Sequence, residues 1–445
     1  MREVICIHIG QGGVQMGETF WDLLSHEHHI RPDRTLSESG MWYGELSFKS
    51  FFKGTTETST FTPRSLFVDL EPSSIDKIKV GTYRNFYEPY QLLSAKEDAA
   101  SNFARGRYNV GKNIIDTTMD RIRKLVDDCS SLKGFLVFNT VGGGTGSGLG
   151  SLVLERLSDE YEKKSKTVVG VFPSSKLSYY PTEAYNAIFA SHYLLERQAS
   201  TYVFENEALH QICQTQLDLE KPTYQDLNGL IAPIMSSVTT GWRYPGYDIT
   251  EHWIPYYRLR FNVCSYCPFW PADKTYCFPH TIEELTTLVF KAENYAVTCN
   301  PKYSKHMAVG MVYRGDCSPK PVNEAIAKLK ASNQVRMINW TPVSMINTAY
   351  GPDVGIRLGG MLAKIWRTVC AVSNSTGLIE NFQRYVDNFN RMFAKRAYVH
   401  WYTKEGLEEF EFNQAKEDVE SLIDDYGEAE ADIDVDEQDE VKQAN

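Results

Sequence analysis

Five glycines occur among the seven residues from Gly142 to Gly148, directly after the apolar run Phe135–Asn139. An apolar run, a glycine cluster and the amphipathic stretch Ser151–Asp159 together predict a buried strand, a tight loop and a helix. Glycines remove side chains, so the backbone N–H groups of such a loop can close on an anion at the positive end of the helix. The pattern therefore predicts a phosphate site, and a flexible turn without a ligand is the alternative.

A second glycine-bearing loop, Gly10–Gly17, follows the apolar run Val4–Ile9. Neither loop fits the two commonest phosphate motifs. A P-loop needs a lysine after its glycines, and none follows here. The dinucleotide fingerprint needs a third glycine where this chain has Gln15, which argues against a nicotinamide oxidoreductase. We expect backbone amides, helix ends and a metal to balance the phosphate charge.

Residues 1–205 alternate apolar runs with amphipathic stretches. Further strands are predicted at Ser65–Leu70, Thr167–Phe172 and Tyr202–Glu205, and a helix at Glu183–Arg197. Buried strands that alternate with helices favour a doubly wound parallel sheet. The fold class expected for this part is therefore α/β.

The pattern changes after a helical connection over 206–240. Strand-like runs with fewer helices between them predict a mixed α/β second domain over 206–375; these runs are Leu259–Cys264, Met307–Tyr313, Gln334–Trp340 and Trp366–Val372. Helical periodicity over Leu378–Arg396 and Lys404–Asp425 predicts a C-terminal hairpin over 376–426. Residues 427–445 are predicted to form a disordered acidic tail.

Composition places the chain among globular cytosolic proteins. Hydrophobic residues make up 42% and charged residues 23%, and no run of about 18 apolar residues suggests a membrane span. The nine cysteines follow no secretory leader, so we expect reduced thiols. Cys264 and Cys267 form a CxxC without a second pair, which favours buried thiols over a zinc site.

The negative charge is concentrated at the C-terminus. Residues 424–445 hold ten acidic residues and one lysine, a charge of −9 out of the formal −11 of the chain. Such a block cannot bury enough apolar surface to fold, and it repels nucleic acid while attracting basic partners. A solubilising tail without a partner is the alternative.

The two glycine loops and three other segments resemble the nucleotide loops of the tubulin family. These segments are Asp69–Pro72, Lys96–Ala100 and Tyr224–Asn228, and their order and spacing match the family over nearly the whole chain. The match is to the α type rather than the β type because of Thr250-Glu251, the long connection Gly351–Gly360 and the segment Ala394–Tyr402.

The resemblance implies a subunit that binds GTP and Mg²⁺, pairs with β-tubulin and polymerises into cytoplasmic microtubules and spindle fibres. Lateral α-tubulin neighbours would be further partners, and motors and associated proteins would bind the acidic tail. A non-polymerising tubulin-like GTP-binding protein that acts as an interaction module remains the alternative. Neither nucleic acid binding nor a membrane span is expected.

The resemblance also assigns roles to residues. Glu71 would face the Mg²⁺ shell, Asp69 and Asp98 would flank the γ-phosphate, Glu183 would contact the ribose, and Tyr224 would stack on guanine. The expected nucleotide-binding residues are Gly10, Gln11, Gly12, Asp69, Glu71, Asp98, Ala99, Ser101, Thr140, Gly142, Gly143, Gly144, Thr145, Gly146, Tyr179, Glu183, Asn206, Tyr224 and Asn228. Taken alone, Asn206 could instead cap a helix and Tyr224 could belong to the core.

Catalysis is expected across a subunit interface. By resemblance, Glu251 would act on the GTP held by the next subunit, and Asp248 could contribute from the same helical face. A carboxylate can orient the attacking water or accept its proton. The alternative is that both acids merely favour a helix N-terminus. The segment around them is shorter than in the family, and Tyr179 replaces the threonine usual near the ribose.

Overall fold

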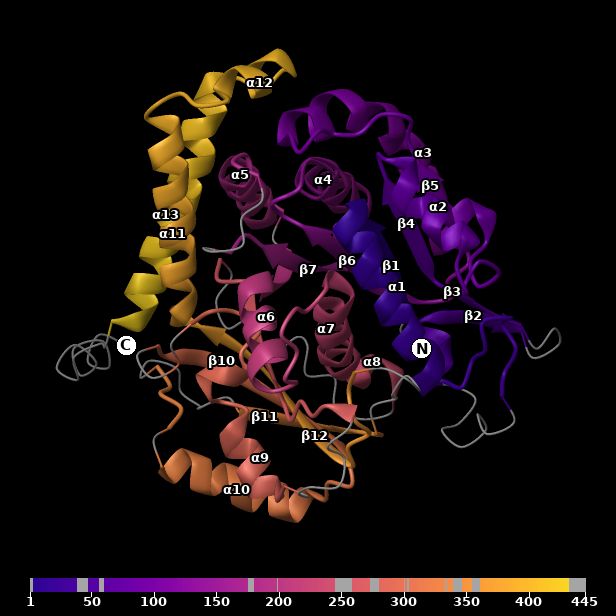
Figure 1. Cartoon of the computed structure of the whole chain (residues 1–445), viewed down its shortest axis with the longest axis vertical. Helices are drawn as coiled ribbons and strands as arrows, with labels where there is room; N and C mark the ends of the chain where they lie inside the picture. Colours follow the sequence, from indigo (N-terminus) through magenta and orange to yellow (C-terminus); the bar gives the residue numbers. More distant parts are fainter. Residues whose placement is uncertain are drawn as a thin grey trace, which may run out of the picture.

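The computed structural model of the chain is built around one sheet of ten strands (Figure 1). It describes residues 3–37, 47–55, 60–174, 180–197, 199–244, 258–272, 280–299, 301, 304–332, 334–338, 346–353 and 361–431. The strand order is β11-β10-β12-β9-β8-β7-β6-β1-β4-β5.

Six strands of the first half are parallel, as the alternating pattern predicted. They are β1 (Glu3–Ile9), β4 (Ser65–Asp69), β5 (Leu92–Ser94), β6 (Leu132–Thr140), β7 (Ser165–Phe172) and β8 (Ser200–Glu205). Every residue of β1 and β4 is buried. Strands that are buried along their whole length need cover on both faces of the sheet.

Helices supply that cover in two layers. One face packs against α1 (Gly10–Glu27), α2 (Pro72–Val80), α6 (Asn206–Thr215) and α7 (Tyr224–Val238). The other face packs against α3 (Val110–Asp127), α4 (Gly150–Glu160) and α5 (Glu183–Glu196). Alternate residues of β1 divide between the two cores: Val4 and Cys6 belong to the first, Ile5 and Ile7 to the second. The doubly wound α/β fold is confirmed.

The same sheet continues into the second half, where the strands become mixed in direction. β9 (Phe261–Cys267) is parallel to β8, β12 (Arg367–Ser375) is antiparallel to β9, and β10 (His306–Gly315) is antiparallel to β12. The edge strand β11 (Ile346–Gly351) is parallel to β10. Helices α9 (Ile282–Leu288) and α10 (Pro319–Ala331) cover this part, and the short α8 (Thr240–Arg243) follows α7.

The strand predicted at Gln334–Trp340 was wrong within the residues described there. Residues 334–338 contain no strand, although Met337 forms an isolated bridge with His306. The apolar residues that produced the pattern, Val335 and Met337, pack against the core beneath β10. The strand is β11 instead, which buries one residue, Ala349, and so lacks an apolar alternation to recognise.

Three C-terminal helices lie against α5 (Figure 1). They are α11 (Ile379–Phe393), α12 (Val399–Lys404) and α13 (Glu409–Glu430). Helix α13 runs four residues past the predicted boundary because Tyr426 is fully buried and donates its hydroxyl to the Phe261 carbonyl. The predicted tail beyond Ala431 lies outside the described residues.

The remaining elements are short. A hairpin joins β2 (Phe52–Thr55) to β3 (Thr60–Pro63). In the part of the chain that the structure describes, 3-10 turns occur at Phe48–Ser50, Pro89–Gln91, Ala292–Asn294 and Thr376–Leu378. Two single-turn π-helices, η4 (Arg105–Asn109) and η5 (Thr145–Leu149), precede α3 and α4.

The described cysteines are free thiols, five of them buried and three half-buried. All eight that the structure describes are free, and Cys264 and Cys267 are both buried in β9. Burial raises the pKa of the Cys267 thiol to about 12. Within the described ranges no cluster of three metal-ligating side chains occurs, and none of the helices has the length and apolar character of a membrane span.

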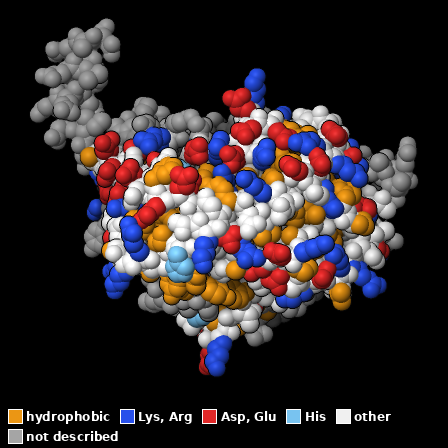
Figure 2. Space-filling view, turned by 90° about the horizontal axis from the view of Figure 1, so that it is seen from above, with side chains coloured by type: hydrophobic (Ala, Val, Ile, Leu, Met, Phe, Trp, Pro, Cys, Tyr) orange, Lys and Arg blue, Asp and Glu red, His pale blue; other side chains and the backbone are white. Residues whose placement is uncertain are grey.

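Charges of both signs mix on the surface. Figure 2 shows lysine and arginine side chains interspersed with aspartate and glutamate over the face seen there. This agrees with a charge of about −2 for residues 1–423, the −11 of the chain less the −9 of its last 22 residues.

Candidate functional site

Most of the residues predicted to bind a nucleotide lie where the order of the parallel strands reverses. The chain leaves β1 toward β4 on one side, whereas β6 occupies the other side of β1. Ligands of open parallel sheets bind in the crevice outside the carboxyl ends of the strands at such a point. Both glycine segments begin there. Gly10–Gly17, predicted as a loop, instead forms the first turns of α1 directly after Ile9 of β1, and the loop after Thr140 of β6 enters η5 at Thr145.

A cavity of about 570 Å³ opens at this crevice. Seventeen of the nineteen predicted nucleotide residues line it: Gly10, Gln11, Gly12, Asp69, Glu71, Asp98, Ser101, Thr140, Gly142, Gly143, Gly144, Thr145, Gly146, Glu183, Asn206, Tyr224 and Asn228. The structure thus brings together segments that are spread over more than two hundred residues of the chain.

The two glycine segments form one wall of this cavity. At several of their glycines the backbone lies too close to β6 to leave room for a side chain. A Cβ at Gly12 would lie 2.3 Å from Thr140 Cγ2, and one at Gly146 would lie 2.2 Å from the Thr140 carbonyl oxygen. Gly10 has φ +73°, a left-handed conformation that favours glycine. The Asn139 side-chain amide donates to the Gly146 carbonyl at 2.9 Å and anchors the second loop to β6.

The loop Asp98–Ser101 forms the facing wall. Ala100 and Ser101 both have positive φ, 49° and 53°, which is uncommon for residues with a side chain. The Asp98 carboxylate accepts the Ala100 N–H at 3.0 Å and stabilises this turn. A conformation of this kind persists where its surroundings fix it, and it is frequent at ligand sites.

Two carboxylates at the end of β4 fit a hydrated Mg²⁺. Burial raises the pKa of Asp69 to about 6, and its Oδ2 atom has no hydrogen-bond partner among the described residues. Glu71 follows at the N-cap of α2, where its Oε1 atom accepts the Ser73 hydroxyl. A buried carboxylate oxygen without a partner is costly, and a bound cation removes that cost.

Residues that suit a purine base lie at the opposite end of the cavity, at the starts of two helices. Asn206 is the first residue of α6, and its N-cap is Glu205, so Asn206 itself is not the cap. Tyr224 is the first residue of α7 and is 51% exposed, so it does not belong to the core. An aromatic ring and the amides of Asn206 and Asn228 can stack on a base and bond its edges.

One described residue among the predicted site residues, Ala99, does not line the cavity. Ala99 is fully buried behind the loop, where a Cβ at Gly144 would lie 3.0 Å from its own Cβ. Tyr179, Asp248 and Glu251 lie outside the described residues.

The structure adds seven lining residues that the sequence reasoning did not assign to the site: Gln15, Met16, Val171, Phe172, Pro173, Ser174 and Tyr180. Gln15 lies one helical turn after Gln11, so the helical period of α1 could have suggested it. Val171 and Phe172 are the last residues of β7, and Pro173 and Ser174 follow it, at the edge where ligands of parallel sheets bind.

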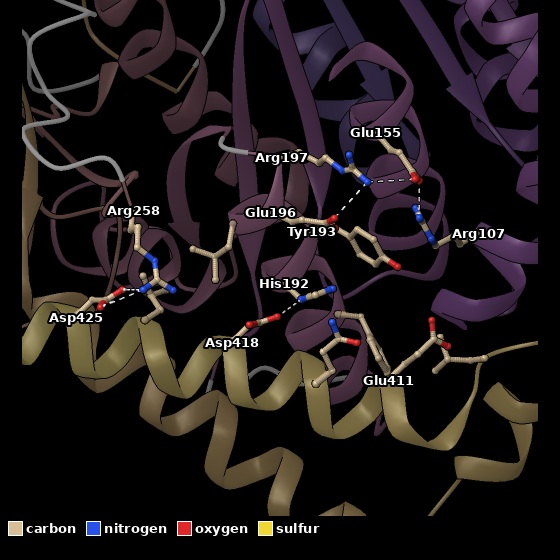
Figure 3. Close-up of a pocket in the computed structure, with 15 residues that line it drawn as sticks. Arg107, Glu155, His192, Tyr193, Glu196, Arg197, Arg258, Glu411, Asp418 and Asp425 are labelled. Atoms are coloured by element: carbon tan, nitrogen blue, oxygen red, sulfur yellow. Dashed lines mark hydrogen bonds and ion pairs between the residues drawn. The ribbon is translucent and has the colours of Figure 1, made fainter. Parts of the chain in front are cut away.

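Two other cavities differ in chemistry. One of about 980 Å³ adjoins the first and shares Gln15, Tyr224 and Asn228 with it. The other, of about 590 Å³, lies between α5 and α13 (Figure 3). Its charged side chains pair with one another: Glu155 bonds both Arg107 and Arg197, and His192 bonds Asp418. No glycine loop borders the described lining of the cavity between α5 and α13, so this cavity lacks the backbone donors that a phosphate needs.

Comparisons with known proteins agree with the geometry. The model of the "Tubulin/FtsZ family, GTPase domain" matches residues 3–214, and that of the "Tubulin C-terminal domain" matches residues 257–387. The tubulin alpha-2 chain of Eleusine indica is 45% identical over 99% of this chain and 100% of its own length. The tubulin alpha-1 chain of Arabidopsis thaliana is 46% identical over 96% of each chain.

Proposed function

This chain belongs to the tubulin family and carries its GTPase domain, and we propose that it binds one GTP with Mg²⁺ in the cavity between β1 and β6. The single observation that supports this most strongly is the cavity itself. Seventeen predicted ligands from at least seven separate segments converge there, with glycines at the points where a Cβ would collide.

Each part of the cavity has a proposed role. The two glycine loops, with Gln11, Thr140 and Thr145, hold the phosphates through backbone and hydroxyl donors. Asp69 and Glu71 hold Mg²⁺, which supplies positive charge beside the triphosphate. We propose that Asn206, Asn228 and Tyr224 recognise guanine. Glu183 would contact the ribose, as would Tyr179.

We propose that the chain pairs with β-tubulin and polymerises into cytoplasmic microtubules, with lateral α-tubulin neighbours in the wall. Its similarity to curated tubulin alpha chains over nearly its full length supports the α role. The division into a GTP-binding domain over 1–205, an intermediate domain over 206–375, a helical hairpin over 376–426 and an acidic tail over 427–445 remains our proposal. The tail would recruit motors and associated proteins, including those of the spindle.

Hydrolysis would be completed between subunits. We propose that Glu251, with help from Asp248, acts on the GTP of the neighbouring β-type subunit and not on the chain's own nucleotide. The described cavity supports this division of labour. The charged residues that line the described cavity are the acids Asp69, Glu71, Asp98 and Glu183. The first three would be engaged by the metal and the phosphates of the chain's own nucleotide. We therefore propose that the base for water attack on the partner's GTP lies on a different surface of the chain.

Nucleotide content tests the first proposal. The chain is co-purified with a β-type partner, denatured, and its released nucleotides are counted against the same complex carrying Gly146→Ala. Wild-type complex should release about two guanine nucleotides per pair, as two sites require, and the variant about one. Adenine nucleotide, or an unchanged count in the variant, would contradict the assignment.

Filament formation separates the two functions that remain. Electron microscopy of the complex with GTP should show microtubules, and Glu251→Ala should assemble while the partner's GTP persists in the lattice. Glu283→Gln, a neutralised acid on the exposed face of α9, serves as the control and should hydrolyse normally. Persistent globular particles would favour the alternative, a GTP-binding interaction module.

A further inference from the structure

Asn186, in the first turn of α5, touches both walls of the candidate nucleotide cavity from behind. Its side-chain Nδ2 donates to the Ser101 carbonyl at 2.9 Å and to the Gly142 carbonyl at 2.8 Å. Its Oδ1 accepts the Phe103 N–H at 3.1 Å. The side chain is fully buried and does not line the cavity itself. One amide group therefore joins the backbones of the two loops that line the cavity.

The fourth bond of this amide comes from the C-terminal helices. Tyr402 of α12 donates its hydroxyl to Asn186 Oδ1 at 2.7 Å. A second acceptor for this hydroxyl, the Thr182 carbonyl, lies farther away at 3.4 Å. The side-chain amide of Asn186 thus donates two hydrogen bonds and accepts two. If the amide were flipped, its NH₂ group would face the Phe103 N–H, and its oxygen would face the carbonyl oxygens of Ser101 and Gly142. Tyr402 thus helps to fix which way Asn186 points.

The two loops are in direct backbone contact, so a small displacement of one moves the other. A Cβ at Gly144 would lie 2.5 Å from the Asn102 nitrogen, and one at Gly106 would lie 2.4 Å from the Gly144 carbonyl oxygen. Both loops lead into π-helical turns, η4 and η5, which pack on each other. Such turns are uncommon and often occur at functional sites. Asn186 holds the left-handed turn Ala100–Ser101 at its Ser101 carbonyl.

The C-terminal helices are joined to this region at further points. Asn102 donates its side-chain amide to the Trp401 carbonyl at 3.0 Å, and Tyr108 of η4 donates to Glu411 of α13 at 2.9 Å. On the far side of α5, His192 bonds Asp418 of α13 (Figure 3). A change in the position of α12 would therefore reach Ser101 through Asn186 and through the neighbouring Asn102, and a change in the position of α13 would reach η4 through Tyr108.

We propose that Asn186 is a positioning residue that sets the spacing of the two phosphate loops, and that Tyr402 couples this spacing to the docking of the C-terminal helices. The inference rests on the proposed GTP site. Linkage requires the effect to be mutual: if the γ-phosphate favours one spacing of the loops, it also favours one seating of α12, and a ligand on those helices changes the preference for GTP over GDP.

The test compares two deletions of one hydroxyl. Tyr402→Phe removes the bond to Asn186. Tyr185→Phe removes a hydroxyl that donates to the Ala397 carbonyl at 2.9 Å, so it also joins α5 to the C-terminal segment but touches neither loop. Both rings are fully buried and lie 5.5 Å apart. The two variants should lose similar thermal stability, which makes Tyr185→Phe the matched control.

The decisive measurement is the ratio of GTP to GDP affinity in the complex with a β-type partner. We expect about a threefold to tenfold drop in this ratio for Tyr402→Phe, the loss of one buried hydrogen bond. A larger drop is expected for Asn186→Ala, and no change for Tyr185→Phe. If Asn186→Ala does not fold, the two tyrosine variants still decide the question. Equal ratios in Tyr402→Phe and Tyr185→Phe would overturn the proposal.

Hydrogen exchange supplies the reciprocal readout. In the wild-type complex, amides of α12 should exchange more slowly with GTP than with GDP in the chain's own site, and Tyr402→Phe should remove that difference. No nucleotide dependence in the wild type would also overturn the coupling. A wild-type complex without guanine nucleotide in this chain would instead refute the proposed function, so the two failures are distinguishable.

Discussion

Arg314 Nη1 lies 3.1 Å from Glu27 Oε1, across 287 residues of sequence, and both side chains are almost wholly buried. Arg243 bonds the other oxygen of Glu27, and the Ser236 hydroxyl bonds Oε1 at 2.6 Å. Burial alone would raise the pKa of Glu27, but the two guanidinium groups outweigh it and hold the pKa at about 2. This cluster joins α1 to α8 and to β10.

Glu27→Gln should destabilise the protein strongly because it leaves two buried guanidinium groups without a counter-charge. Breaking a buried ion pair by removing one partner costs about 3–5 kcal/mol of unfolding free energy. Chemical denaturation of the complex measures this loss. Glu283→Gln, which removes an exposed pair with Lys328, is the control and should leave the midpoint nearly unchanged. Equal effects of the two variants would refute the role given to the buried cluster.

Mg²⁺ binding should weaken as the pH falls through about 6, because the raised pKa of Asp69 means that its carboxyl gains a proton there. Above that pH the carboxylate is charged and holds the cation, and below it the proton competes with the metal. Titration calorimetry of Mg²⁺ against the nucleotide complex between pH 5.5 and 7.5 measures the dependence. Asp69→Asn should bind Mg²⁺ weakly at every pH and lose the step. A wild-type affinity that is flat across this range would contradict the assignment of Asp69.

Acid should destabilise the fold below neutral pH through three buried histidines. Burial lowers the pKa of His8 and of His28 to about 3, and that of His306 to about 4. The unfolded chain binds these protons near pH 6.5 and the folded chain does not, so stability is lost as the pH falls from 6.5. At pH 5 each histidine costs about 2 kcal/mol, from 1.36 kcal/mol for each pH unit.

Urea denaturation at pH 7 and pH 5 measures how steeply the free energy of unfolding falls with pH. His306→Gln should reduce this slope by the contribution of one histidine. A slope that the His306 substitution does not change would show that this histidine titrates normally.

Gly146→Ala should abolish nucleotide retention, since its Cβ would lie 2.2 Å from the Thr140 carbonyl oxygen and push the loop away from β6. Gly427→Ala is the matched control, because nothing lies within 4 Å of a Cβ there and the residue belongs to α13. That control should retain nucleotide and gain about 0.5–1 kcal/mol of stability, as alanine does in a helix. Loss of nucleotide in both variants would indicate a general folding defect.

To remove the tail, the chain should be truncated after Ala431 rather than after Asp425. The shorter truncation removes six acidic residues and one lysine but keeps Tyr426, whose buried hydroxyl bonds the Phe261 carbonyl. We expect the shorter truncation to fold normally and to weaken the binding of basic partners at low salt. Truncation after Asp425 should lower the melting temperature as well. Co-sedimentation at two salt concentrations checks the binding, and equal binding with and without the tail would leave it as a solubiliser.

The first half of the fold could be predicted from the sequence because strands that are buried on both faces consist mostly of apolar residues. β1 and β4 each hold a short apolar run followed by a glycine-bearing or acidic segment, and these segments also placed most of the candidate site. β11 could not be recognised, since an edge strand with one buried residue has no periodic pattern. Asn186 was missed for another reason. Its role arises from carbonyl groups of two distant loops, and no spacing in the sequence encodes where those groups meet.

The position of β12 in the sheet has a consequence for synthesis of the chain. β12 lies between β9 and β10, although its residues 367–375 follow those of β10 by about fifty positions. Until a ribosome has released that segment, β9 and β10 have no partner for the edges that β12 later pairs. Unpaired apolar strand edges attract other chains. The nascent protein therefore passes through an interval in which these edges are unpaired, and the rate at which residues 316–375 are synthesised governs how long that interval lasts.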